Sequence, residues 1–182
     1  HEGVTVNWAN RITLLRIILI PFFVGALIYG HLDRAFLIFS LAVLTDAIDG
    51  YIARMHSQKT ILGSFLDPLA DKLLLTTAFI SLAMIGNLPI RLPPWIPLIV
   101  ISRDIIIILG AALIQMNTGR LDIHPSLWGK LTTFLQMATV LGILVGFSGV
   151  RVIWWIMVAF TILSGWKYVQ QGMNLLNAKE SL

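Results

Sequence analysis

The chain has 182 residues, of which 57% are hydrophobic and 12% are charged, whereas a soluble domain averages about 25% charged residues. This composition indicates a protein of the lipid bilayer rather than a soluble one. The chain has no cysteine, which excludes disulfides, thiolate metal sites and cysteine nucleophiles, and its net charge of +4 is too small to indicate nucleic-acid binding.

Six apolar runs are long enough to cross a bilayer, which takes about 20 residues of helix. Short polar segments with turn-forming residues separate the runs and leave no room for a second domain. The runs cover residues 11–30, 34–55, 61–86, 94–117, 127–147 and 150–175. The sequence therefore predicts a single all-α integral membrane domain over residues 1–182, with six transmembrane helices.

The segment before the first run contains Val4, Val6 and Trp8. Two interpretations fit it equally well: a short amphipathic segment that lies on the membrane surface, or a disordered leader.

Basic residues near the ends of the runs predict the orientation, because Lys and Arg are enriched on the cytoplasmic side. With a cytoplasmic N-terminus, the cytoplasmic side holds Arg11, Arg54, Lys59, Arg120, Lys130 and Lys179. The opposite side then holds only Arg34, Arg91 and Arg151. We therefore expect both termini in the cytoplasm, and a compact chain of this kind fits a bacterial inner membrane.

Four aspartates lie inside the second and third runs. Asp46 and Asp49 are three residues apart, and Asp67 and Asp71 are four apart, so each pair shares one face of a helix. An ionisable residue inside a membrane span costs roughly 2.5–3.5 kcal/mol, so four cost on the order of 10 kcal/mol unless something compensates them. Residues of this kind are functional-site candidates.

The four carboxylates form an all-oxygen ligand set, which suits Mg²⁺ or Mn²⁺ better than zinc. The second and third runs are joined by a short loop, so the two pairs can face each other and would repel strongly without cations. Such ions bridge a diphosphate and neutralise charge during phosphoryl transfer. On these residues alone a small ion or proton transporter stays an alternative, since transporters also carry buried carboxylates.

The residues around the aspartates extend the pattern. Residues 46–71 read Asp-x-x-Asp-Gly-x-x-Ala-Arg, then eight residues, then Gly-x-x-x-Asp-x-x-x-Asp. This stretch resembles the signature of the CDP-alcohol phosphatidyltransferase family at all eight fixed positions. The resemblance extends to a leader containing Asn7, Asn10, Thr13 and Arg16 and to residues 101–104, so it covers nearly the whole chain.

The resemblance implies a six-helix membrane enzyme, usually a homodimer, whose site opens to the cytoplasmic leaflet. It implies that Asp46, Asp49 and Asp67 hold two metal ions that bind the diphosphate of CDP-diacylglycerol. Asp71 would complete the metal site and take the proton from the hydroxyl of the acceptor alcohol.

The remaining signature residues are expected to bind the CDP-lipid. The resemblance implies that Gly50, Ala53 and Gly63 make room for the cytidine nucleotide and that Arg54 contacts its phosphates before CMP leaves. The alternative for Arg54 is a positively charged anchor at the cytoplasmic surface.

The identity of the acceptor alcohol is predicted from fewer residues. The chain is most similar to two branches of the family, phosphatidylglycerophosphate synthase, which uses glycerol 3-phosphate, and the CMP-forming cardiolipin synthase, which uses phosphatidylglycerol. Ala111 and Thr132 stand where the first branch usually has Arg and Lys. Both departures remove a cation. A phosphate monoester such as glycerol 3-phosphate requires several basic residues to bind it, so their loss counts against that acceptor. The balance favours phosphatidylglycerol by a small margin, with glycerol 3-phosphate as the alternative.

Three basic residues, Arg103, Arg120 and Lys130, are expected to bind the acceptor, with an interface anchor as the alternative for Lys130. Arg103 and Asp104 are neighbours on a helix and point in different directions. We therefore expect Arg103 to reach a polar cavity rather than to form a simple ion pair with Asp104.

Overall fold

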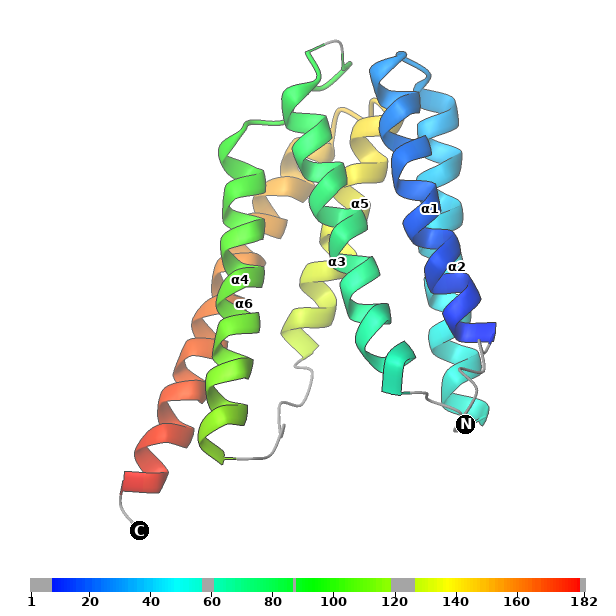
Figure 1. Ribbon diagram of the computed structural model, residues 1–182. Helices are drawn as coiled ribbons and strands as arrows, with labels where there is room; N and C mark the ends of the chain where they lie inside the picture. The colour runs from blue at the N-terminus through cyan, green and yellow to red at the C-terminus, as the bar shows by residue number, and fades with distance from the viewer. Residues whose placement is uncertain (1–7, 57–60, 87, 119–126, 181–182) are drawn as a thin grey trace. The chain divides into compact units, whose positions relative to one another are not determined.

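The computed structural model describes the backbone of residues 8–56, 61–86, 88–118 and 127–180, and the side chains of 14–45, 72–86, 88–110, 127–170 and 172–173. All regular secondary structure in these residues is helical (Figure 1). The helices are α1 (Trp8–Ile28), α2 (Leu32–His56), α3 (Ile61–Met84), α4 (Trp95–Thr118), α5 (Leu127–Val145) and α6 (Val150–Glu180). The predicted all-α architecture is therefore confirmed within the described residues. The segment containing Val4 and Val6 lies outside them.

Two helical stretches among the described residues have both the length and the apolar composition of a membrane span. They are Leu127–Val145 in α5 and Val150–Gln170 in α6. Shorter apolar helices cover Leu14–Ile28 and Lys72–Met84. Six membrane crossings therefore stay a prediction, whereas the helices themselves are present.

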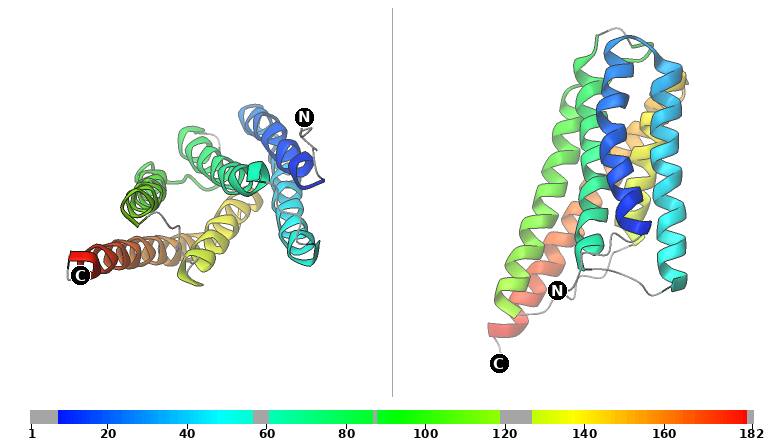
Figure 2. Two further views of the ribbon diagram at one scale, coloured as in Figure 1. Left: turned by 60° about the horizontal axis from the view of Figure 1, so that its bottom comes forward. Right: turned by 45° about the vertical axis from the view of Figure 1, so that its right-hand side comes forward.

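The chain forms two compact units. The first contains His1–Leu92 and Val140–Phe147, and the second contains Pro93–Thr139 and Ser148–Leu182. Within the first unit α1 packs against both α2 and α3, and within the second α4 packs along α6, as the two views of Figure 2 show. One family domain over residues 1–182 stays a prediction.

Apolar side chains hold the first unit together. Phe23 of α1 and Phe39 of α2 are fully buried, with ring centroids 5.5 Å apart in a tilted arrangement. Such aromatic pairs contribute about 0.5–1.5 kcal/mol beyond the area that they bury. Leu74 and Phe79 of α3 are also buried. This core fixes the helices that carry the four aspartates.

A glycine in the left-handed conformation ends both α1 and α5. Gly30 has a φ of 73° and Gly146 a φ of 71°. The backbone N–H of Gly30 donates to the carbonyl of Leu27 at 3.1 Å, and that of His31 donates to the carbonyl of Ala26 at 2.8 Å. These two bonds form a Schellman motif, and the same pattern follows at Gly146. Backbone hydrogen bonds therefore define where these helices stop.

Candidate functional site

The four aspartates lie on the two helices that residues 57–60 connect. Asp49 lies about two turns before the end of α2, and Asp67 lies about two turns after the start of α3. Asp46 and Asp71 each lie about one turn further into their helix. The backbone positions of the four aspartates thus fall at two matching levels along the two helices, near the end of the first unit where α2 stops and α3 starts (Figure 1).

The side chains of the signature lie outside the described ones. This holds for the predicted metal ligands and base, and for the predicted CDP-lipid contacts Gly50, Ala53, Arg54 and Gly63. Among the side chains that the structure describes, no group of three or more His and carboxylate residues could hold a metal ion. The donor set on α2 and α3 fits a hard divalent cation by its chemistry, because all of its ligand atoms are oxygens. The assigned roles stay predictions.

Arg16 of α1 is a buried cation in the same unit. Its side chain is 1% exposed, and α1 packs against both of the helices that carry the aspartates. Arg16 lies about three turns before the end of α1 at Ile28, and Asp71 lies between three and four turns before the end of α3 at Met84, at about the same height. The family resemblance places Arg16 only in the leader and gives it no further role. Its place within the apolar stretch Leu14–Ile28 was the signal that could have singled it out.

The second unit buries several polar side chains as well as apolar ones. Apart from Arg16, the buried polar residues among the described side chains all belong to this unit. They are Arg103, Asp104, Thr132, Gln136, Thr139, Thr161 and Ser164, contributed by α4, α5 and α6. Buried polar side chains are expensive in a membrane protein and mark functional regions.

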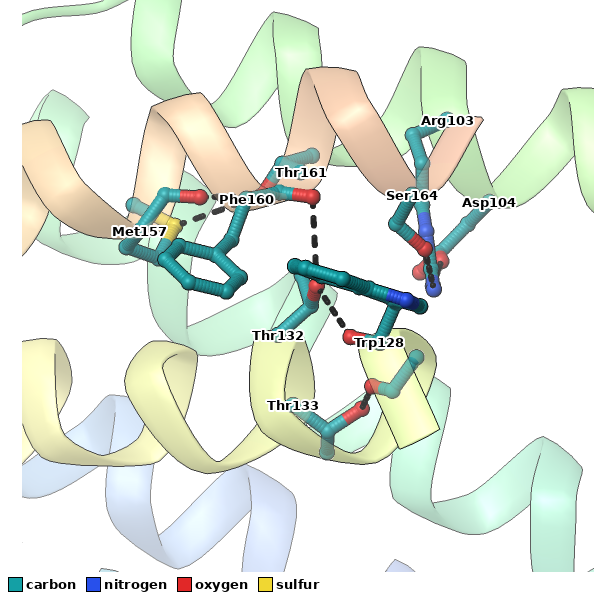
Figure 3. A network of polar contacts seen from close by, with 10 residues as sticks. Arg103, Asp104, Trp128, Thr132, Thr133, Met157, Phe160, Thr161 and Ser164 are labelled. Atoms are coloured by element: carbon teal, nitrogen blue, oxygen red, sulfur yellow. Dashed lines mark hydrogen bonds and ion pairs between the residues drawn. The ribbon is translucent and has the colours of Figure 1, made fainter. Parts of the chain in front are cut away.

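Arg103 pairs with its own neighbour and with α6 (Figure 3). Its Nη1 donates to Oδ1 of Asp104 at 2.8 Å, and its Nη2 donates to Oγ of Ser164 at 2.9 Å. The expectation that Arg103 and Asp104 would not form an ion pair is therefore wrong. The long arginine side chain bends back to the adjacent carboxylate, because a buried guanidinium without an opposite charge would be costly.

Thr132 stands where one branch of the family usually has a lysine. It is fully buried, and its hydroxyl donates to the carbonyl of Trp128 at 2.7 Å, with the carbonyl of Phe160 in α6 3.4 Å away (Figure 3). Position 132 therefore serves the contact between α5 and α6. The predicted acceptor-binding residue Lys130 is exposed, while the side chain of Ala111 and all of Arg120 lie outside the described residues.

The start of α5 is tied to α6 by aromatic contacts. The Trp128 ring stacks on Phe160 with centroids 5.6 Å apart, and Nζ of Lys167 lies 3.8 Å from the centroid of the Trp128 ring. A cation over an indole contributes about 0.5–1 kcal/mol at an exposed site. These contacts hold the first turn of α5, which contains Lys130, against α6.

A family model for CDP-alcohol phosphatidyltransferases matches residues 6–165. A probable phosphatidylglycerophosphate synthase of Mycobacterium tuberculosis is 34% identical over 180 residues, covering 92% of this chain and 82% of the relative. The CDP-diacylglycerol--glycerol-3-phosphate 3-phosphatidyltransferase of Bacillus subtilis is 35% identical over 194 residues, covering 93% of this chain and 97% of the relative. A probable CMP-forming cardiolipin synthase of Drosophila melanogaster is 32% identical, covering 72% of this chain and 44% of the relative. The chain, a phosphatidyltransferase, therefore belongs to the CDP-alcohol phosphatidyltransferase family.

Proposed function

We propose that the protein transfers the phosphatidyl group of CDP-diacylglycerol to glycerol 3-phosphate and releases CMP. The observation that carries this proposal is the arrangement of the aspartates in two matching levels on α2 and α3, within the complete signature of the family. The choice of acceptor follows the relatives, because the B. subtilis enzyme is named for glycerol 3-phosphate and matches almost over its full length.

The relatives support glycerol 3-phosphate better than phosphatidylglycerol, which was the acceptor expected from the sequence by a small margin. That margin came in part from two missing cations. One of them is explained without reference to the acceptor, because Thr132 is buried and hydrogen bonded where α5 meets α6. The absence of lysine there is therefore weak support for a less charged acceptor.

In the proposed reaction Asp71 accepts the proton of the attacking hydroxyl, since an alcohol is a poor nucleophile at neutral pH. The hydroxyl oxygen bonds to the phosphorus of the phosphatidyl group, and the bond from that phosphorus to the CMP oxygen breaks. Asp46, Asp49 and Asp67, together with Asp71, would hold two Mg²⁺ or Mn²⁺ ions, and enzymes of this family generally depend on a divalent metal. A divalent metal bound there would supply positive charge that offsets the charge developing on the attacking and leaving oxygens.

The residues next to the carboxylates would receive the nucleotide. Gly50, Ala53 and Gly63 carry small side chains or none, so a ligand can approach the backbone of α2 and α3 closely. Arg54 would supply charge-assisted hydrogen bonds to the phosphates. Arg103, Arg120 and Lys130 would bind the phosphate of the acceptor.

We further propose that all six helices cross a bacterial inner membrane, with both termini and the site on the cytoplasmic side, and that two copies form a homodimer. The apolar spans in α5 and α6 support the membrane location. Large exposed apolar side chains on α6, including Ile162, Leu163 and Trp166, fit a surface that faces lipid.

The proposal is tested by CMP release from CDP-diacylglycerol by the purified protein in detergent. We expect release that requires both glycerol 3-phosphate and Mg²⁺ or Mn²⁺, and that stops when the metal is chelated. Asp46→Asn and Asp49→Asn should each raise the metal concentration needed for half-maximal activity. No CMP with either glycerol-based acceptor would overturn the proposal, and unchanged metal titrations would remove Asp46 and Asp49 from the ligand set.

A further inference from the structure

We propose that Ser164 is a positioning residue for acceptor recognition. Together with Asp104, it holds the guanidinium of Arg103 so that the remaining N–H groups meet the phosphate oxygens of the acceptor. This inference rests on the proposed function, and it adds a residue on α6 to a site so far assigned to other segments.

The geometry around Arg103 leaves donors for a ligand. A guanidinium has five N–H donors. Within the described part of the chain, Arg103 donates from Nη1 to Asp104 and from Nη2 to Ser164, while its buried Nε has no hydrogen-bond partner. The whole residue is only 8% exposed, and a buried donor without an acceptor is unfavourable. An anionic ligand beside Arg103 would satisfy it.

Three contacts fix the arginine side chain. Its two terminal nitrogens are held by Asp104 and Ser164, and its stem lies against α6, since a Cβ added at Gly165 would come within 3.6 Å of Cγ of Arg103. Two of these three contacts come from α6, which packs along α4. The guanidinium is thus oriented before the ligand arrives, which lowers the entropic cost of binding.

Asp104 and Ser164 contribute differently. The carboxylate of Asp104 offsets the charge of Arg103 and so lowers the cost of burying it, but it also weakens the attraction of Arg103 for an anion. The Ser164 hydroxyl carries no net charge, so it directs the guanidinium without reducing that attraction. The ligand chemistry that a planar guanidinium recognises best is an oxyanion bound through two N–H groups, as in a phosphate monoester.

The test is the steady-state kinetics of Ser164→Ala with glycerol 3-phosphate and CDP-diacylglycerol varied in turn. Loss of one hydrogen bond to a charged group predicts a KM for glycerol 3-phosphate raised about tenfold. The KM for CDP-diacylglycerol and kcat should change less than about twofold, because the fold and the metal site are intact. Alanine is well tolerated in a helix, so the variant should stay folded.

Thr161→Val is the matched control. Thr161 lies about one turn before Ser164 on the same helix and is also fully buried. Its hydroxyl donates within α6, to the carbonyl of Met157 at 2.7 Å, with Sδ of the same residue at 3.7 Å. Removing it deletes a buried hydroxyl but no contact with Arg103. The KM for glycerol 3-phosphate should therefore stay at the wild-type value.

A double-mutant cycle shows whether Ser164 acts through Arg103. In an Arg103→Lys background the paired terminal nitrogens are gone, so Ser164→Ala should change the KM for glycerol 3-phosphate by less than about twofold. The inference is overturned if Ser164→Ala leaves the KM for glycerol 3-phosphate unchanged or raises the KM values of both substrates equally. It is also overturned if Thr161→Val changes the KM for glycerol 3-phosphate as much as Ser164→Ala does, or if Ser164→Ala keeps its effect in the Arg103→Lys background. Wild-type protein that releases no CMP would instead overturn the proposed function, and this inference with it.

Discussion

Asp71 is the residue on which the proposed chemistry depends most. It lies about one turn after Asp67 on α3, on the helix face predicted to carry the metal ligands. We expect Asp71→Asn to abolish turnover while the protein still binds CDP-diacylglycerol, because the amide cannot accept the proton of the acceptor hydroxyl. Turnover and binding of a labelled CDP-lipid, measured on the same preparation, check this. Turnover of the variant at the wild-type rate would refute the role of Asp71 as the base.

Asp104 is predicted to matter for stability, because it compensates a buried charge. Removing one partner of a buried ion pair costs about 3–5 kcal/mol, whereas an amide can still accept a hydrogen bond from Arg103. Asp104→Ala should therefore lower the unfolding temperature in detergent more than Asp104→Asn does. Equal unfolding temperatures for the two variants and the wild type would show that the pair carries no stability.

The contacts of Arg103 show what the sequence alone could not predict. The apolar runs and the spacing of the aspartates were enough to find α2 and α3 and to place each pair on one helix face. The same spacing argument failed for Arg103 and Asp104, because a long side chain can bend back to its neighbour. No motif signals the contact of Arg103 with Ser164, since the two residues lie on different helices, far apart in the sequence.

At the scale of elements, the predicted runs and the observed helices agree closely, and their differences have simple causes. The apolar run that ends at residue 147 overshoots α5, because Gly146 adopts a positive φ and ends the helix at Val145. The run that ends at residue 175 falls short of α6, which continues to Glu180 through a stretch that contains the polar residues Asn177, Lys179 and Glu180. The hydropathy pattern identifies a stretch that is long enough to cross a membrane, whereas backbone hydrogen bonds determine at which residue the helix ends.

Two glycines of the first unit provide a matched test of the α1 terminus. A Cβ at Gly30 or at Gly25 would meet nothing within 4 Å, so the two positions differ mainly in backbone conformation. Gly30 has a φ of 73°, which costs an alanine roughly 1–2 kcal/mol. Gly25 lies inside α1, where alanine is favoured over glycine by about 1 kcal/mol.

We therefore expect Gly30→Ala to lower the unfolding temperature in detergent and Gly25→Ala to raise it or leave it unchanged. The contrast isolates the conformation of the turn from packing. Similar shifts of the same sign for both variants would contradict the assignment of a left-handed cap at Gly30.

At the scale of the whole molecule, the absence of cysteine allows the membrane topology to be tested directly. Leu127 at the start of α5 is 79% exposed, and Ser148 beyond its end is also exposed. If α5 crosses the bilayer, Leu127→Cys should react with a membrane-impermeant thiol reagent only from the cytoplasmic side and Ser148→Cys only from the opposite side. Labelling of both from the same side would contradict the predicted orientation and the crossing by α5.

The identity of the acceptor tests the proposed function of the molecule most directly. Wild-type protein in detergent is given CDP-diacylglycerol, Mg²⁺ and either glycerol 3-phosphate or phosphatidylglycerol, and the lipid products are separated by mass. We predict phosphatidylglycerophosphate with the first acceptor and no cardiolipin with the second. Cardiolipin formation without phosphatidylglycerophosphate would contradict the proposed acceptor, and no lipid product with either would contradict the proposed function.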